Sequence, residues 1–172
     1  MTTYAAVTAR PVPVWANRVA HAIPLILLPH CLWRLPFAWG FEMGMIGDEQ
    51  AMPWWAPVYV VALSVVSEAL ALLSFGLVRV WGEVVPGWVP LLGGRRIPPY
   101  VAVVPAVLGS LAAIALWGQE VLAWFGFAEG LAGFENIWWQ VLAQVCITPG
   151  ILWGPLVLAL TVAYVIRRRR QG

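Results

Sequence analysis

A single acidic residue, Glu68, interrupts a long apolar stretch of the chain and is the first candidate for a chemical role. An ionised carboxylate in the hydrocarbon of a membrane costs several kcal/mol unless it is paired, solvated or protonated. Embedded acids of this kind bind protons or coordinate ions in many membrane proteins, which makes Glu68 a candidate proton or ion site. A glutamate can also be satisfied inside a helix bundle, where it only fixes how the helices pack. Both interpretations of Glu68 remain open.

His30 is the residue best placed to pair with Glu68. If both lie on membrane-spanning helices, the helical rise of about 1.5 Å per residue puts them at depths that match within a few Å. A hydrogen bond between Glu68 and His30 is therefore geometrically allowed. The other histidine, His21, precedes His30 by nine positions and points to the opposite side of the same helix. The two histidines are therefore not expected to bind one metal ion or one haem iron, and each is expected to be a packed or interfacial residue.

Arg34 lies one helical turn beyond His30, near the outer end of the same apolar stretch. Its side chain can extend to the lipid headgroups, or it can pair with an acidic residue outside the membrane. Other polar residues occur at that level, because Gln140, Gln144 and Thr148 repeat every four positions. Together with Arg34 they could line an outward-facing polar cavity, or they could hydrogen-bond one another and hold the helices together.

No motif of a known catalytic centre accompanies these residues. The chain lacks a P-loop, an HExxH, a GxSxG and a dinucleotide-binding fingerprint. Cys31 and Cys146 lie at similar depths in separate apolar segments, so a disulfide is allowed, but buried thiols that act as small apolar groups are the favoured interpretation. No metal site and no cofactor is expected, and the chain is not expected to be an enzyme.

The overall composition places these residues in a membrane protein. Of the 172 residues, 62% are hydrophobic and 10% are charged, whereas soluble domains average about 45–50% and about 25%. So little charge cannot cover the surface of a soluble domain of this size. The net charge is +2 and the basic residues are scattered, which also argues against binding to nucleic acids.

Four apolar segments are long enough to cross a membrane as helices, which need about 20 residues each. They cover residues 18–39, 54–78, 100–118 and 145–166, and the third can extend to residue 125. Between them lie an outer segment 40–53, an inner loop 79–99 and a second outer segment 119–137. The sequence therefore predicts one all-α domain over residues 1–172, an integral membrane four-helix bundle.

The arginines are concentrated in alternate connecting segments. With the amino terminus placed inside, nine of the ten arginines lie in inner segments, and the two outer segments contain acids but no arginine. Positive residues are retained on the cytoplasmic side, so both termini are expected to be cytoplasmic. Six of these arginines are expected to contact anionic lipid headgroups at the cytoplasmic face: Arg95, Arg96, Arg167, Arg168, Arg169 and Arg170.

Small residues predict where the helices approach one another. Gly150 and Gly154 form a GxxxG pattern, which permits close helix packing, and a proline beside each of them predicts a kink in the fourth span. Gly109 and Ala113 offer a second face of small residues on the third span. These patterns permit homo-oligomers without indicating them.

The inner loop carries a family resemblance. Its run WGEVVPGWVPLLGGRRIPP at residues 81–99, followed by an apolar helix, resembles small, uncharacterised multi-span membrane proteins that are common in actinobacteria. The resemblance covers chiefly residues 81–110. It implies a multi-span protein of a bacterial plasma membrane and brings no activity, cofactor or site residue with it.

The leading functional hypothesis is a non-enzymatic membrane protein that acts as a structural, accessory or partner-binding module. The alternative from a different class is a small proton- or ion-coupled transporter or channel that uses Glu68. A third hypothesis is a haem- or quinone-binding subunit of a membrane enzyme. The expected partners are the lipid bilayer, with its anionic lipids, and either a second copy of the chain or another membrane protein.

Overall fold

The computed structural model describes residues 11–46, 53–90, 93–125, 127 and 133–169, and within them the protein is all-helical. The α-helices are α1 (Val14–Arg34), α2 (Ala56–Leu73), α3 (Pro99–Trp124), α4 (Ile137–Ile147) and α5 (Trp153–Arg169). Short 3₁₀ helices extend or join them: η1 (Leu35–Trp39), η2 (Ser74–Leu77), η3 (Val80–Gly82) and η4 (Thr148–Leu152).

Four described stretches are long and apolar enough to cross a membrane, which confirms the predicted number of candidate spans. They are Val14–Trp39, Ala56–Leu77, Pro99–Ala123 and Ile137–Arg169. The fourth begins at Ile137 rather than at residue 145 because Asn136 caps α4. The Asn136 side-chain oxygen accepts hydrogen bonds of 3.1 Å from the backbone N–H groups of Trp138 and Trp139. The predicted interruption of this span is confirmed, since η4, which contains Pro149, separates α4 from α5.

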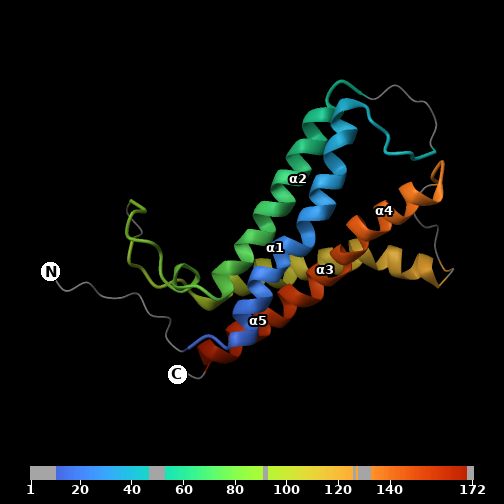
Figure 1. Cartoon of the computed structure of the whole chain (residues 1–172). Helices are drawn as coiled ribbons and strands as arrows, with labels where there is room; N and C mark the ends of the chain where they lie inside the picture. Colours follow the sequence, from blue (N-terminus) through green and yellow to red (C-terminus); the bar gives the residue numbers. More distant parts are fainter. Residues whose placement is uncertain (1–10, 47–52, 91–92, 126, 128–132, 170–172) are drawn as a thin grey trace.

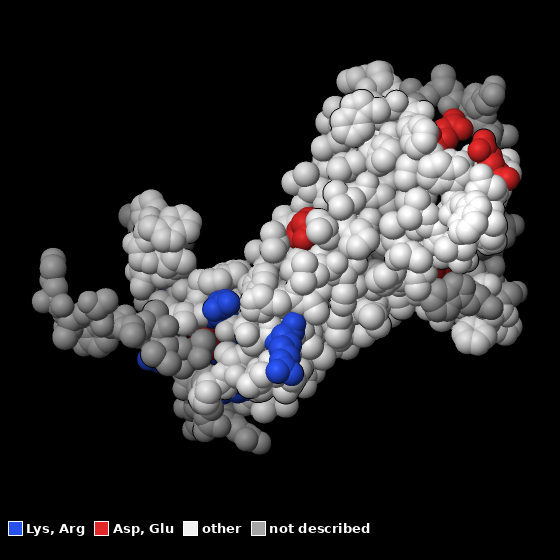
Figure 2. All heavy atoms as spheres, in the orientation of Figure 1, with Lys and Arg blue, Asp and Glu red and all other residues white. Residues whose placement is uncertain are grey.

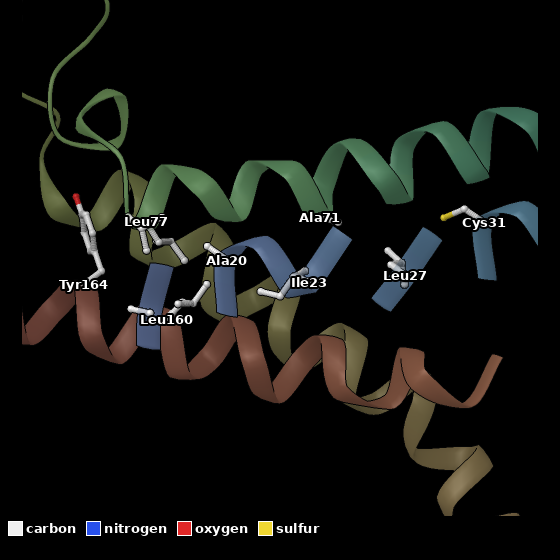
Figure 3. Packing of buried hydrophobic residues seen from close by; sticks show 10 residues of the cluster. Ala20, Ile23, Leu27, Cys31, Ala71, Leu77, Leu160 and Tyr164 are labelled. Atoms are coloured by element: carbon white, nitrogen blue, oxygen red, sulfur yellow. The ribbon is translucent and has the colours of Figure 1, made fainter. Parts of the chain in front are cut away.

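Helix α1 lies at the centre of the core. Figure 3 shows Ala20 and Ile23 of α1 between α2, which contributes Ala71, and α5, which contributes Leu160. Ala20, Ala71 and Leu160 are all fully buried. Small residues on α1 and α2, such as Ala20 and Ala71, let the two helix backbones approach closely.

The helices form two pairs that diverge along the molecule. Helix α1 begins and α5 ends at the same end of the protein, which we call the terminal end; the opposite end is the far end (Figure 1). Helix α2 runs beside α1, and α3 packs along α5. Toward the far end, the α1–α2 pair separates from α3 and α4 (Figure 1).

Helix α3 packs closely against Gly150 and Gly154, the GxxxG pattern of the fourth span. A Cβ atom added to Gly150 would lie 2.5 Å from the Trp117 side chain, and one added to Gly154 would lie 2.8 Å from the Ser110 carbonyl oxygen. The prediction of close packing at these glycines is therefore confirmed. The prediction for Gly109 is wrong, because an added Cβ there meets nothing within 4 Å. Ser110, one position further along α3, faces inward instead and is 1% exposed.

The two connecting segments at the far end bind each other. The backbone N–H of Ile46 donates to the Gly133 carbonyl at 2.7 Å, and that of Glu135 donates to the Gly44 carbonyl at 2.8 Å. Gly44 has a φ of +69° and its Cα lies against the Trp139 indole, so neither its backbone nor the space beside it suits a side chain. Trp139 therefore ties the connection after α1 to the start of α4.

Candidate functional site: an embedded polar cluster

Arg34 and His30 form a hydrogen-bonded pair on α1. The Arg34 guanidinium donates from its Nη2 atom to Nε2 of His30, one helical turn earlier. Side chains on a helix lean toward its amino terminus, so an arginine near the end of α1 reaches back over the preceding turn. Arg34 is half-buried and directed toward the middle of its span. The Arg34 side chain therefore reaches back along α1 to His30 and does not extend beyond the end of the helix.

The hydrogen bond determines the protonation state of His30. A guanidinium has only donors, so Nε2 of His30 must be the acceptor. The imidazole is therefore neutral and its proton is on Nδ1. His30 is 8% exposed, and its Nδ1 atom is buried without a hydrogen-bond partner among the described residues.

Trp117 of α3 lies against the His30 ring. The two rings meet edge to face, with their centroids 4.8 Å apart and their planes at 74°. Trp117 is 7% exposed because its six-membered ring fills the space over Gly150. Its indole Nε1–H is a second buried donor without a partner in the described part of the chain.

Glu68 approaches α1 at Cys31 rather than at His30. The Cys31 thiol lies within electrostatic range of both the Glu68 carboxyl group and the Arg34 guanidinium. No hydrogen bond joins Glu68 to His30 in the residues that the structure covers. Neighbouring helical positions differ by about 100° in direction, so α2 meets the Cys31 side of α1 while α3 meets the His30 side. One carboxylate oxygen of Glu68, Oε2, is buried and unpartnered among the described residues.

These five residues, Glu68, Cys31, Arg34, His30 and Trp117, are called the embedded polar cluster below. They come from three candidate spans, since Cys31, Arg34 and His30 belong to α1, Glu68 to α2 and Trp117 to α3. Cys31 is a free thiol, as is Cys146, so the interpretation of both as unbridged thiols is confirmed. Arg34 has no carboxylate within 4.0 Å in the described residues, so its charge is not neutralised by direct contact there.

The predicted polar stripe on the fourth span lies outside this cluster. Gln140 and Gln144 are exposed and Thr148 is half-buried, whereas Ala143 is fully buried against the α1 side. No hydrogen bond joins the three polar side chains to Arg34 within the described residues. The stripe therefore follows a neighbouring face of α4, and the structure does not bring its members to Arg34.

The arginines assigned to lipid headgroups differ in exposure. Arg95, Arg96 and Arg169 are exposed, Arg168 is half-buried and donates to the Ile97 carbonyl at 2.7 Å, and Arg170 lies outside the described residues. Arg167 is 7% exposed, and its guanidinium binds both the Glu83 carboxylate at 2.9 Å and the Leu77 carbonyl at 3.1 Å. Arg167 therefore joins the end of α5 to the loop after α2.

Sequence reasoning missed Trp117, and it assigned Arg167 to lipid headgroups although its guanidinium binds Glu83 inside the protein. Tryptophans near helix ends are typical of membrane interfaces, so the residue type alone does not indicate that Trp117 is buried. The usable signal was spacing, because Ser110, Ala113 and Trp117 fall on one face of α3 and are all buried.

Fold and site together define a helical protein with four candidate membrane spans and an embedded cluster of polar side chains at the junction of α1, α2 and α3. No group of three or more metal-binding side chains occurs among the described residues. No known protein family, no curated protein and no solved structure matches this chain.

Proposed function

We propose that this chain is an integral protein of a bacterial plasma membrane with both termini on the cytoplasmic side. Its four apolar helices supply the spans. Figure 2 supports the orientation, because basic atoms gather toward the terminal end and acidic atoms toward the far end of the face it shows. Basic residues are retained in the cytoplasm, so the terminal end is the inner one. The resemblance of residues 81–110 to actinobacterial membrane proteins agrees with this location.

Within the membrane, the protein acts as a non-enzymatic binding module whose contact face is α2. The observation that carries this proposal is Glu68, a half-buried carboxyl group on a helix whose remaining surface is mostly apolar and exposed. Val58 and Val65 of that surface are 71% and 62% exposed. Lipid tails cannot solvate a carboxyl group, so a second protein surface over Glu68 lowers its free energy.

A second copy of the chain is the partner that fits this face best. A two-fold interface brings the same patch of each copy together, so Glu68 of one protomer lies opposite Glu68 of its partner. A protonated carboxyl group both donates and accepts, so two such groups satisfy each other. Ala62 and Ala69 are exposed one heptad apart on α2 and allow close approach of the two helices.

The test is photocross-linking of the purified chain in liposomes. A photoreactive amino acid replaces Val65 on α2 or, as the matched control, Leu108 on α3; both side chains are 62% exposed. We expect a covalent dimer from position 65 that persists when the protein is diluted in lipid. Cross-links that random collisions produce at position 108 should disappear on the same dilution. Glu68→Gln, which keeps a donor and an acceptor, should retain the dimer, and Glu68→Leu should reduce it several-fold.

Three results would contradict the proposal. Equal dilution curves at positions 65 and 108 would show that α2 is not a contact face. Full dimer yield in Glu68→Leu would remove Glu68 from the contact. Turnover of a lipid or quinone by the purified chain, or a proton flux that Glu68→Gln abolishes, would replace the binding role with an enzymatic or transport role.

A further inference from the structure

Two touching rings at the junction of α1, α3 and η4 each carry a buried N–H donor. The first is Nδ1–H of His30, which is 8% exposed, and the second is Nε1–H of Trp117, which is 7% exposed. Neither has a hydrogen-bond partner among the described residues. Their rings touch, with centroids 4.8 Å apart. An unpaired donor in an environment without water carries its full desolvation penalty, so this pair calls for an acceptor.

Arg34 makes the His30 donor stronger. Its cation is hydrogen-bonded to Nε2, on the opposite edge of the imidazole from Nδ1. A positive group at Nε2 polarises the ring, and hydrogen bonds in such a chain strengthen one another. The positive charge of Arg34 thereby makes Nδ1–H of His30 a stronger hydrogen-bond donor. No carboxylate lies within 4.0 Å of Arg34 in the described part of the chain to neutralise it.

All three groups donate and none is free to accept. This combination repels cations and cannot recognise a ligand through the ligand's own donors. It suits an acceptor with negative charge, since charge-assisted hydrogen bonds are the strong ones. Both rings are more than nine-tenths covered, and Trp117 already fills the space over Gly150. The tight packing favours an acceptor of one or a few atoms over a ring-sized ligand.

We propose that His30 and Trp117, with Arg34 supplying the charge, form a binding site for a small monovalent anion of halide type. The anion accepts from His30 Nδ1–H and Trp117 Nε1–H and compensates the embedded guanidinium. The site is independent of self-association through α2, because Glu68 meets α1 on the Cys31 side and the Trp117 ring contacts α1 at His30.

The test uses the full-length chain in liposomes, with its histidine rings labelled with ¹⁵N. The chain contains two histidines, and His21 is the internal control because it is exposed and its Nδ1 already bonds the Asn17 carbonyl at 2.7 Å. Starting from a bulky organic anion, chloride or bromide is titrated in. We expect His30 to be neutral with its proton on Nδ1. Its Nδ1 resonance should shift and saturate as halide is added, while His21 does not respond.

Variants separate the contributions of the donors. Arg34→Gln should weaken the apparent halide affinity by roughly tenfold or more, as loss of a charged hydrogen-bond group does. Arg34→Lys, which keeps the charge, should bind more tightly than Arg34→Gln. Trp117→Phe keeps the ring packing, removes Nε1–H and should weaken binding several-fold. Trp88→Phe is the control, since Trp88 is 83% exposed in the loop between α2 and α3.

Clear outcomes would overturn the proposal. A His30 signal that ignores halide throughout the titration would show that no anion binds. An Nδ1–H that is already hydrogen-bonded without halide would show that the chain or water satisfies it. A His30 that carries its proton on Nε2 would exclude the arrangement altogether, because Nδ1 would then be an acceptor.

Discussion

Replacing Glu83 by alanine is expected to lower the free energy of unfolding by about 3–5 kcal/mol, the usual cost of breaking a buried ion pair from one side. Glu83 is 4% exposed and its carboxylate accepts from Arg167 at 2.9 Å. Removing it leaves the Arg167 guanidinium, itself 7% exposed, as an uncompensated buried cation. Arg168, whose guanidinium lies 4.0 Å from the same carboxylate, loses the second contact. The measurement is equilibrium unfolding of the full chain in mixed detergent micelles.

Two further variants isolate the cause. Glu135→Ala removes an exposed carboxylate at the far end and is expected to change the free energy of unfolding by no more than about 0.5 kcal/mol. A double variant, Glu83→Leu with Arg167→Met, removes both charges and should recover much of the loss, because apolar groups of similar volume can replace a buried pair. A Glu83→Ala variant as stable as Glu135→Ala would mean that this pair does not hold the terminal end together.

At the terminal end, the arginine count predicted the topology but did not indicate the ion pair between Arg167 and Glu83. The arginine run at the carboxyl terminus was expected to mark the cytoplasmic side and to meet lipid headgroups, and that expectation gave no reason to separate Arg167 from its neighbours. The signal was Glu83, the one acid in a loop that carries Arg95 and Arg96. An acid in a basic segment needs a partner. Which arginine supplies it depends on how α5 packs against η2 and η3, and no local pattern encodes that.

Only part of the embedded polar cluster could be predicted from the sequence. Glu68, His30 and Arg34 stand out from sequence alone, because polar groups in apolar segments are costly and therefore few. Helical rise also gives their depth. Rotation about the helix axis does not follow from either argument, and it decides that Glu68 meets Cys31 and that His30 meets Trp117. The spans were predictable because length and apolar composition suffice for them. Helix α3 ends at Trp124, within the extension to residue 125 that the sequence allowed, whereas the fourth span begins at Ile137 instead of residue 145 because Gln140 and Gln144 lower the hydropathy without ending the helix.

Gly154→Ala is expected to lower the free energy of unfolding by about 1–3 kcal/mol, the cost of forcing extra volume into a packed contact. The added Cβ would lie 2.6 Å from the Ile114 side chain and 2.8 Å from the Ser110 carbonyl oxygen. It would also lie 3.0 Å from the Ile114 backbone nitrogen. A flexible side chain can turn away, but the backbone of α3 can only move as a helix, so the substitution must push α3 off α5. The same unfolding measurement applies.

Gly109→Ala on α3 is the matched control and should have the opposite sign. Nothing lies within 4 Å of its added Cβ, so only the helix propensity changes, which favours alanine by about 1 kcal/mol. If Gly154→Ala is as neutral or as stabilising as Gly109→Ala, α3 does not pack closely against the GxxxG pattern.

The same two variants also test the contact between α3 and the embedded polar cluster. Trp117 continues the same face of α3 and holds its ring 4.8 Å from that of His30, so displacing α3 at Gly154 should move the ring-nitrogen signals of His30. Gly109→Ala should leave those signals in place, because it changes no contact that α3 makes.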